Sequence, residues 1–498
     1  MRDRQSSIKE IGVAILGYGI VGRGVAHAIR ANADLITKKT GLRIRLLHIL
    51  DIIDIHDGPD ADLLTRSIDA ILDDPGVQVV VETIGGLGAA FEFTKQAMEH
   101  NMHVVTSNKE LVAEHGPELL ALADANKVYY RFDASVGGGI PIILPVEECL
   151  VADDIDEVTG IINGTTNFML TYMKSSGVGF EEALDKAREL GYAEHNPVSD
   201  IEGLDACRKL AILSSIAFGK FLDWKTIHTE GISDVSLEDI NRAGDLGRVL
   251  KLVARIRRTP GGMPEAYVLP VMLDRRCQLA NVDGVYNAVL VHGDLTGNIM
   301  FYGKGAGMYP TGNAIVSDII KAAGTGNSNL APLDKEGMAP GGFMRQGGLV
   351  SGGDGFYGAA GLGANPYWDV GDALKLADFD MYTHDFYVRV KTPDPDAYRD
   401  ILFREFPQAK LTPDFGGGEF VGGGEFIDGG GELVDGGYGE FVGGYGSDSE
   451  FVGGKKGSCI FTVAGLTEGD FSQKLARVNE KVAGSSTGFV ARLLPRSL

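Results

Sequence analysis

The amino-acid sequence predicts an α/β protein whose first domain is a doubly wound parallel sheet. Short β-branched runs alternate with amphipathic segments over the first third of the chain, beginning with IGVAIL at 11–16 and a helix at 20–31. The glycine pattern GYGIVG, at 17–22, lies directly between that strand and that helix. A second run, RIRLLHIL at 43–50, is followed by an acidic residue, Asp51. This succession of strand, glycine turn, helix, strand and acid is typical of a sheet that binds a dinucleotide.

Three further strand-like runs, VQVVVE, HVVT and VYYRF, extend the predicted sheet. We therefore expect a dinucleotide-binding domain at 1–135, completed by a helix at 311–323 that packs back onto it. Residues 136–310 mix helices, at 180–190 and 200–217, with strands such as AYVLPVML and VYNAVLV. This mixture predicts a second, α+β domain that binds the substrate.

The composition changes in the last third of the chain. Residues 324–364 are rich in glycine, serine, asparagine and proline, and we place a linker at 324–378. Two strand–helix units, HDFYVRV with PDAYRDILFREF and CIFTVAGL with DFSQKLARVNEKV, predict a small α+β domain at 379–498. Acidic glycine-rich repeats at 414–457, such as GEFVGG and GELVDGG, interrupt that domain. Their small apolar pairs do not offset the entropy of ordering glycine, so we interpret them as a flexible loop, with a weak β-type assembly or a partner-binding segment as the alternative.

Composition excludes several classes of partner. The chain has 498 residues and a formal net charge of −22, so its mean field repels nucleic acid and anionic membranes. No stretch approaches the roughly 18 apolar residues of a membrane-spanning helix, and the first ten residues lack the apolar run of a signal peptide. The cysteines have no paired spacing that would suggest zinc or disulfides. We expect a cytoplasmic protein that binds small molecules.

The glycine loop predicts how a dinucleotide is held. Gly17 permits the tight turn, Gly19 lets the backbone approach a pyrophosphate, and Gly22 lets the helix pack closely on the strand. Amides at the helix start, at Ile20 and Val21, offer free donors to the diphosphate. These features predict a Rossmann-type domain.

The acid after the second strand bears on the choice of cofactor. Asp51 suits the ribose hydroxyls and repels a 2′-phosphate. The following segment, IIDIHDGPD, contains no Arg or Lys. The pattern therefore favours NAD over NADP, and a solvated aspartate at the end of a strand is the alternative.

A helix expected to begin near Asp200 carries charge on its apolar face. At steps of three and four it aligns Ile201, Asp205, Lys209, Ile212 and Ile216. Ser199 and Glu202 fit a capping box that would start this helix. An Asp–Lys pair that shares a stripe with isoleucines predicts a buried or cleft-lining site, because buried charges need partners. With Glu194 in the loop before the helix, the residues suit a substrate that carries an amino group and exchanges a proton while a hydride moves.

Seven segments within the first 320 residues resemble, in order, those of one enzyme family. They are GYGIVG (17–22), VVVETIGG (79–86), TSNKELVAEHG (106–116), DASVGGGIPII (133–143), GIINGTTNFML (160–170), GYAEHNPVSDIEGLDACRKLAILSSIAFG (191–219) and GKGAGMYPTGNAIVSDII (303–320). The family is homoserine dehydrogenase, which interconverts L-homoserine and L-aspartate 4-semialdehyde with NAD or NADP on the pathway to threonine, methionine and isoleucine. The resemblance implies the same reaction and a homodimer formed through the middle domain.

The resemblance also implies roles for individual residues. It makes Lys209 the proton donor to the aldehyde oxygen, and it places Lys109 beside both the nicotinamide and the substrate. It implies that Glu194 and Asp205 hold the amino end of homoserine and that Thr165 contacts the substrate. The implied cofactor contacts outside the glycine loop are Ile84, Gly191, Gly305 and Gly307.

Two further features follow from the resemblance alone. A site for Na⁺ or K⁺ falls on Asp133, Val136, Gly138 and Ile140, although the family commonly has glutamate where this chain has Asp133. The C-terminal unit weakly resembles the ACT-type regulatory domains of many bacterial members, which implies threonine as an effector. There PDPDAYRD, at 393–400, replaces the usual glycine-bearing turn.

Two other functions compete with this interpretation. An acylating semialdehyde dehydrogenase would need a cysteine nucleophile, and Cys207 is the nearest candidate. On a regular helix Cys207 points away from its neighbours Asp205 and Lys209. A nucleotide-sensing or scaffold protein would bind a dinucleotide without turnover, and the joint presence of Glu194, Asp205, Lys209 and Lys109 argues against it.

Overall fold

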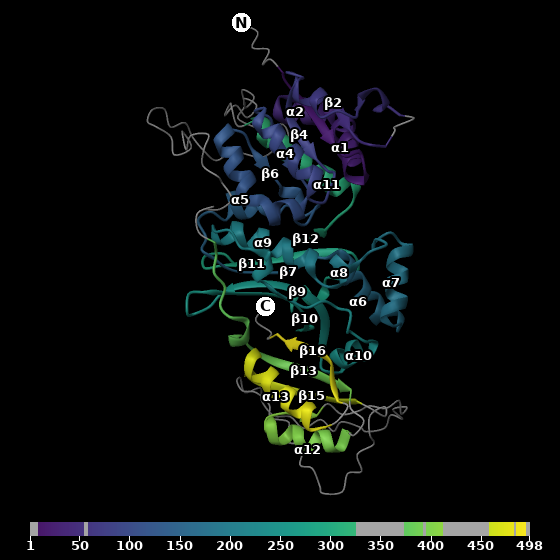
Figure 1. The fold of residues 1–498 in the computed structure, drawn as a ribbon, viewed down its shortest axis with the longest axis vertical. Coiled ribbons are helices and arrows are strands. Elements are labelled where there is room, and N and C mark those ends of the chain that lie inside the picture. Colours follow the sequence, from purple (N-terminus) through teal and green to yellow (C-terminus); the bar gives the residue numbers. More distant parts are fainter. Residues whose placement is uncertain are drawn as a thin grey trace, which may run out of the picture. The chain divides into compact units, whose positions relative to one another are not determined.

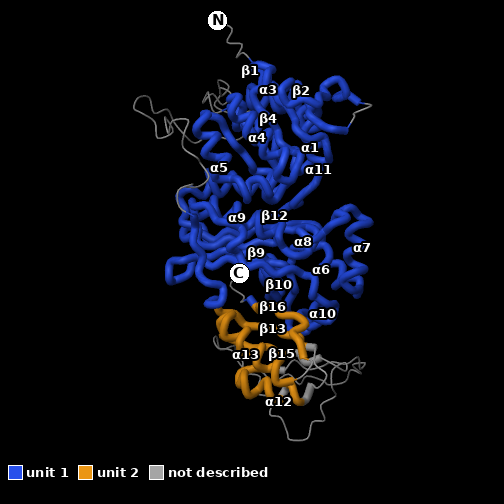
Figure 2. Tube along the Cα trace, in the orientation of Figure 1, with its two compact units in different colours: residues 1–382, 494–498 blue, residues 383–493 orange. Residues whose placement is uncertain are grey.

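The computed structural model describes residues 8–53, 58–324, 373–391, 395–411, 458–482 and 485–494. The chain forms two compact units, residues 1–382 with 494–498 and residues 383–493 (Figure 2). Most of the linker expected at 324–378 lies outside the described residues. The acidic repeats expected at 414–457 lie wholly outside them.

A parallel sheet forms the first part of unit 1. Its strands run in the order β3-β2-β1-β4-β5-β6, and each neighbouring pair is parallel. Three of them, β2, β4 and β6, are labelled in Figure 1. The central strands are buried on both faces, as expected where helices cover both sides of a sheet. The predicted VYYRF strand is only two residues long. The bounds are β1 (Lys9–Leu16), β2 (Leu42–Leu50), β3 (Leu64–Thr65), β4 (Val77–Glu82), β5 (His103–Thr106) and β6 (Tyr130–Arg131).

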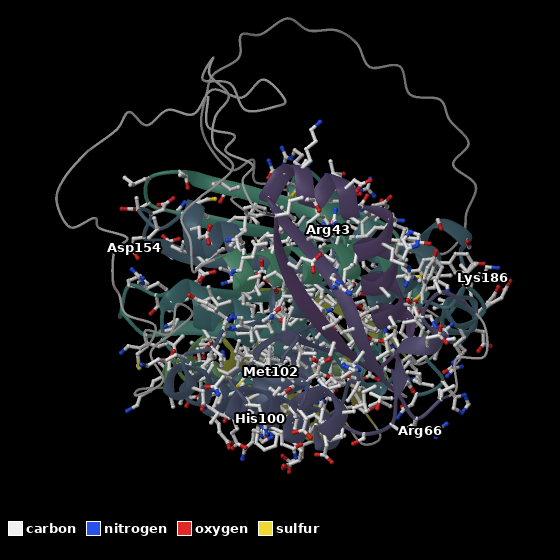
Figure 3. The ribbon with its side chains drawn as sticks, turned by 90° about the horizontal axis from the view of Figure 1, so that it is seen from above. Arg43, Arg66, His100, Met102, Asp154 and Lys186 are labelled. Atoms are coloured by element: carbon white, nitrogen blue, oxygen red, sulfur yellow. The ribbon has the colours of Figure 1, made fainter. Side chains whose placement is uncertain are left out.

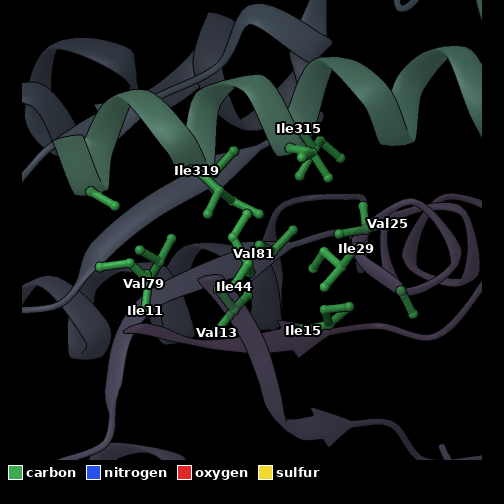
Figure 4. Packing of buried hydrophobic residues seen from close by; sticks show 14 of the residues in the cluster. Ile11, Val13, Ile15, Val25, Ile29, Ile44, Val79, Val81, Ile315 and Ile319 are labelled. Carbon is green, nitrogen blue, oxygen red and sulfur yellow. The ribbon is translucent and has the colours of Figure 1, made fainter. Parts of the chain in front are cut away.

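Helices cover this sheet, and one of them comes from much later in the chain. Helix α11 packs beside α1, and their backbones touch where Gly24 meets Gly312. A Cβ on Gly24 would lie 2.1 Å from the Met308 carbonyl oxygen, so only glycine allows this crossing. Ile315 and Ile319 of α11 enter the same core as Val25 and Val81 (Figure 4). The bounds are α1 (Ile20–Ala31), α2 (Ala33–Thr40), α3 (Asp69–Leu72), α4 (Gly88–Glu99), α5 (Lys109–Asn126) and α11 (Met308–Gly324).

A second sheet forms the rest of unit 1. Its strands run β12-β11-β7-β9-β10 with antiparallel neighbours, and β8 adds to β10 in parallel. Helix α9 lies against strands β7 and β9, and helix α6 lies against strands β9 and β11. The strand bounds are β7 (Ile155–Ile161), β8 (His228–Thr229), β9 (Arg248–Arg258), β10 (Pro264–Asp274), β11 (Tyr286–Gly293) and β12 (Gly297–Lys304). The helices are α6 (Gly164–Ser176), α7 (Phe180–Glu189), α8 (Val198–Ile201), α9 (Leu204–Phe218) and α10 (Leu237–Asp245).

The prediction of one helix over 200–217 is wrong at its first residues. The chain forms a short helix, α8, and then breaks at Gly203, whose φ of 79° is left-handed. The capping box expected from Ser199 and Glu202 is absent here, because Gly203 is the residue before α9 and Glu202 ends α8. The long helix therefore begins at Leu204, just before Asp205.

Unit 2 has the order β13-α12-β14-β15-α13-β16, which is the ferredoxin-like succession of elements. Its strands pair as β16-β13-β15-β14, all antiparallel. Phe386 and Phe471 stack at the centre of its core, which also contains Phe406 and Phe461. The bounds are β13 (Thr383–Lys391), α12 (Pro395–Glu405), β14 (Lys410–Leu411), β15 (Ser458–Thr467), α13 (Glu468–Lys481) and β16 (Ser486–Leu493).

Unit 1 has both buried and exposed charged side chains. Arg43, Arg66 and Asp154 are exposed, and they are labelled in the view from above (Figure 3). Within the described ranges, every helix is too short or too polar to cross a bilayer.

Candidate active site

The glycine loop has the geometry that its sequence predicted. Gly17 has a φ of 93°, and a Cβ on Gly22 would lie 2.1 Å from the Gly17 carbonyl oxygen. A Cβ on Gly19 would meet nothing within 4 Å, so the backbone there faces open space. These conformations leave room for a diphosphate beside the amides that begin α1, at Ile20 and Val21.

Asp51 lies against this loop. Its carboxylate accepts the Tyr18 amide at 2.5 Å and the Ile53 amide at 2.8 Å. The Gly17 amide donates to the carbonyl of Leu50, the residue before Asp51, at 2.8 Å. Asp51 therefore stands beside the glycine turn despite the long stretch of sequence between them.

Two more turns belong to the predicted cofactor site. The segment 83–86 bonds the glycine loop, and the turn at 305–307 leads into α11. Thr83 donates its hydroxyl to the Gly17 carbonyl at 2.7 Å, which draws the 83–86 segment and Ile84 to the loop. At the other turn, Gly305 fits against Asn287 so closely that a Cβ would lie 1.9 Å from the amide nitrogen, and Gly307 has a φ of 131°. Gly307 precedes α11, which packs beside α1.

Asp205 and Lys209 form the centre of a buried cluster on α9. The Lys209 Nζ donates to the Asp205 Oδ2 at 2.7 Å and to the Ile162 carbonyl at 2.9 Å. Asp205 is 3% exposed and Lys209 is 8% exposed. The sequence prediction that this pair is sheltered is therefore correct in its geometry.

Lys109 reaches the same cluster from the dinucleotide domain. It is the first residue of α5, which packs against α9, and its Nζ lies 3.0 Å from the Asp205 Oδ1. Burial raises the pKa of Asp205, but the Lys209 and Lys109 ammonium groups outweigh this effect and hold that pKa below its usual range. Attraction to Asp205 in turn raises the pKa of Lys109. We define Asp205, Lys209 and Lys109 as the catalytic cluster.

Sequence reasoning missed two members of this neighbourhood. The Asn163 amide donates to the Asp205 Oδ2 at 2.8 Å and to the Asp200 Oδ1 at 2.7 Å, so it joins the two carboxylates. The pKa of Asp200 is raised by burial and by the nearby Asp205. Asn163 belongs to the NGTTN motif and caps α6. Its bonds to α8 and α9 join segments distant in sequence, so no local pattern predicts them.

The remaining predicted substrate residues, Thr165 and Glu194, and the predicted cofactor residue Gly191 lie around the loop before α8. Thr165 donates its hydroxyl to the Tyr192 carbonyl at 2.7 Å and so ties this loop to α6. Gly191, with a φ of 73°, begins the loop, and Glu194 is exposed within it.

The predicted cation turn lies beside a second buried cluster. A Cβ on Gly138 would lie 2.8 Å from the Gly305 carbonyl oxygen, so this turn packs on the GKGAG turn, and Val136 and Ile140 are buried. The Asp133 amide donates to the Asp318 Oδ2 at 2.9 Å, and the Arg131 guanidinium lies 3.2 Å from Asp318.

This second cluster is rich in carboxylates. Arg131 also lies 3.6 Å from Glu147. Burial raises the pKa of Asp318 to about 8 and that of Glu147 to about 7, and it raises the pKa of Asp133 as well. We define Arg131, Asp133, Glu147 and Asp318 as the acidic cluster.

Comparison with known proteins decides the family. The family models for homoserine dehydrogenase and its NAD-binding domain match residues 141–320 and 17–133. The homoserine dehydrogenase of Bacillus subtilis is 40% identical over 341 residues, which cover 66% of this chain and 78% of that protein. This chain belongs to the homoserine dehydrogenase family. It is an oxidoreductase with a dinucleotide-binding domain, as the sequence resemblance implied.

Other homoserine dehydrogenases agree. The Neisseria gonorrhoeae enzyme is 42% identical over 323 residues, covering 64% of this chain and 73% of that protein. The crystal structure from Thiobacillus denitrificans superposes with a TM-score of 0.75 at 31% identity and covers 98% of this chain and 99% of that one. A hyperthermophilic archaeal homoserine dehydrogenase in complex with NADPH has a TM-score of 0.54 at 26% identity, covering 65% of this chain and 100% of that one.

The local geometry also disfavours the acylating alternative. Cys207 is 1% exposed, and its thiol donates to the Trp224 carbonyl. Burial raises the pKa of the Cys207 thiol to about 11, so it lacks the thiolate that a nucleophile needs.

Proposed function

We propose that this homoserine dehydrogenase works at the catalytic cluster and that NAD is its preferred cofactor. The observation that carries the proposal is the pairing of a buried ammonium, Lys209, with Asp205 on a helix that meets Lys109 from the dinucleotide domain. An ammonium in this position suits a carbonyl oxygen on which negative charge develops. The cluster also suits the amino and hydroxyl groups of homoserine.

Each residue has a distinct task in this proposal. A bound nicotinamide dinucleotide supplies or accepts the hydride. Lys209 holds a proton at Nζ and gives it to the aldehyde oxygen during reduction. Asp205 orients the Lys209 ammonium through its hydrogen bond, and Lys109 supplies a second positive charge beside the substrate. During oxidation the same step runs in reverse, so the hydroxyl proton passes to the Lys209 Nζ. Asp200 is our candidate for the group that takes up a proton from the cluster afterwards, because its raised pKa favours its protonated form.

Glu194 and Thr165 complete the proposed substrate site. Thr165 fixes the loop that carries Glu194, as its bond to Tyr192 indicates. Glu194 would then bind the substrate amino group from that loop.

The experiment compares two buried lysines. Lys251 is 1% exposed and bonds Asn167 and Val282, outside the catalytic cluster. We expect Lys209→Met to lower kcat for homoserine oxidation by about 10²-fold or more while cofactor binding changes by less than about threefold. Lys251→Met should leave kcat near that of the parent enzyme. Equal losses of turnover and cofactor binding in Lys209→Met would contradict the assigned role.

The cofactor preference rests on Asp51. Its place beside the glycine turn suits ribose hydroxyls, and its charge repels a 2′-phosphate. Rates with NAD and NADP, measured side by side in homoserine oxidation, should favour NAD. Asp51→Ser should lower the ratio of the NAD rate to the NADP rate, mainly by lowering the KM for NADP. An unchanged ratio would show that Asp51 does not determine the cofactor preference.

A monovalent cation is a further part of the proposal. One buried oxygen of Asp133, Oδ1, has no hydrogen-bond partner within the described part of the chain, which suits a cation there. Asp133, with the backbone of Val136, Gly138 and Ile140, would hold Na⁺ or K⁺. Activity in matched Na⁺, K⁺ and tetramethylammonium buffers tests this, and identical rates in all of them would reject a functional ion.

The proposed dimer and effector can be tested together. Strand β12 is the edge of its sheet and exposes Met300 and Tyr302, at 37% and 52%, which suits cover by a second copy. Light scattering should give a homodimer across micromolar concentrations. Homoserine oxidation with and without threonine tests whether unit 2 binds that effector, and an unchanged rate would reject regulation.

A further inference from the structure

Glu82 is a buried carboxylate to which no role has so far been assigned. It ends β4, at the carboxyl edge of the parallel sheet, and is 0% exposed. Its Oε1 accepts the amides of Ile84 and Gly85, at 2.8 Å and 3.1 Å. Its Oε2 accepts the Thr106 hydroxyl at 2.5 Å. One side chain therefore holds two different loops.

The first of these loops belongs to the cofactor site. Residues 83–86 follow β4, and Thr83 donates its hydroxyl to the Gly17 and Leu16 carbonyls at 2.7 Å and 3.0 Å. The amides that Glu82 accepts fix the turn at Gly85, whose φ is 81°. Glu82 thus sets the path of a loop that touches the glycine turn.

The second loop carries Lys109. The Thr106 oxygen that donates to Glu82 also accepts the Asn108 amide at 2.9 Å. The Asn108 side chain caps α5 by accepting the Leu111 amide at 3.1 Å, and its amide donates to the Gly86 carbonyl at 2.7 Å. The next residue is Lys109, which pairs with Asp205. An unbroken chain of bonds thus runs from Glu82 to the catalytic cluster.

The charge of Glu82 fits this task. All three of its partners donate hydrogen bonds, so the carboxylate satisfies them and an amide would not. Burial raises the pKa of Glu82, and its hydrogen bonds to Thr106, Gly85 and Ile84 oppose that rise. A buried charge that lacks hydrogen bonds is costly. A carboxylate here therefore favours the one arrangement of the two loops that supplies its three hydrogen bonds, which an apolar side chain would not do.

We propose that Glu82 is a positioning residue that fixes the distance between the cofactor loop 83–86 and Lys109. It acts through Thr106 on the lysine side and through the Ile84 and Gly85 amides on the cofactor side. The inference rests on the proposed role of Lys109 in turnover.

Substitutions can cut the two sides separately. Thr106→Val removes the link towards Lys109 and leaves the amide bonds of the cofactor loop. We expect kcat for homoserine oxidation to fall by about 10-fold or more, with cofactor Kd unchanged within about twofold, because small displacements of a catalytic group are costly. Thr106→Ser keeps the hydroxyl and should restore most of kcat. Glu82→Gln disturbs both loops, so it should lower kcat and also raise the KM for the cofactor.

The serine and valine variants of Thr106 carry the test even if Glu82→Gln fails to fold. An unchanged kcat in Thr106→Val, a loss of kcat matched by an equal loss of cofactor binding, or a failure of Thr106→Ser to recover would each overturn the inference. Lys109→Ala in the same assay separates the two proposals. If Lys109→Ala loses turnover and Thr106→Val does not, only the positioning role of Glu82 fails. If Lys109→Ala keeps full turnover, the proposed role of Lys109 is itself wrong.

Discussion

The catalytic cluster and the acidic cluster both bury charged side chains in unit 1, but cations outnumber carboxylates in the first and carboxylates outnumber cations in the second. The catalytic cluster has two ammonium groups around one carboxylate, Asp205. The acidic cluster has one guanidinium, from Arg131, among three carboxylates. The pKa of Asp205 lies below its usual range, whereas the pKa values of Asp318 and Glu147 rise to about 8 and about 7.

This difference shows that burial alone does not decide the charge of a carboxyl group. Desolvation raises the pKa in both clusters, and the number of nearby cations decides whether that rise survives. A surplus of cations keeps Asp205 ionised and ready to orient Lys209. A surplus of carboxylates favours proton uptake, and Arg131 serves as the counter-ion of the acidic cluster.

The largest expected effect comes from making the same change, carboxylate to amide, in each cluster. Asp205→Asn leaves the buried Lys209 and the half-buried Lys109 without their anion, so kcat for homoserine oxidation should fall by about 10³-fold. Glu147→Gln removes a charge from a cluster with too many carboxylates, so kcat should stay within about twofold. Steady-state rates on both folded variants test this. Similar losses in the two variants would show that the clusters do not differ in the way described.

The next effect is on stability. Arg131→Met leaves the carboxylates of the acidic cluster without their cation, which should lower the free energy of unfolding by about 3 kcal/mol at neutral pH. Proton uptake by Asp318 and Glu147 limits the loss to the low end of the range for broken buried pairs. Urea denaturation followed by circular dichroism measures it. A variant as stable as the parent would mean that Arg131 does not compensate the buried carboxylates.

The smallest effect is the dependence of stability on pH. Carboxyl groups with raised pKa values bind more protons in the folded than in the unfolded chain, so their contribution is present in mild acid and is lost as pH rises through about 7 and about 8. Asp205 has the opposite sign: its lowered pKa gives stability above the ordinary carboxyl range, and that stability is lost only in strong acid. Between about pH 5 and about 7, the folded-state pKa of Glu147, Glu147→Gln should flatten the decline by up to about 1.4 kcal/mol per pH unit. Parallel curves for parent and variant would assign the decline to other groups.

Local patterns predicted much of the fold. The glycine loop with its amphipathic period and the β-branched run HVVT placed the helix at Ile20–Ala31 and the strand at His103–Thr106 at their observed bounds, because each pattern is complete within a few residues. The break at Gly203 was missed because the capping residues before it gave a stronger local signal than one glycine. On an unbroken helix Asp200 would point about 140° away from Asp205, so its place beside the cluster was hidden.

The site divides in the same way. Asp205 and Lys209 were predictable because a step of four residues joins them directly. Asn163 and Glu82 act through contacts between segments distant in sequence, and no local spacing reveals such bonds. Asp51 is the intermediate case, since its type and strand end were visible but its bond to Tyr18 was not.

The hairpin between β14 and β15 has a consequence for how this chain can change in length. Leu411, the last residue of β14, pairs with Phe461 of β15, so the stretch between them leaves and returns at neighbouring strands. Closing a loop whose ends already meet costs only about 0.6 kcal/mol more for each doubling of its length. We therefore expect this position to tolerate replacement: a short turn or a whole foreign domain could take the place of residues 412–457 without shifting the register of β14 and β15.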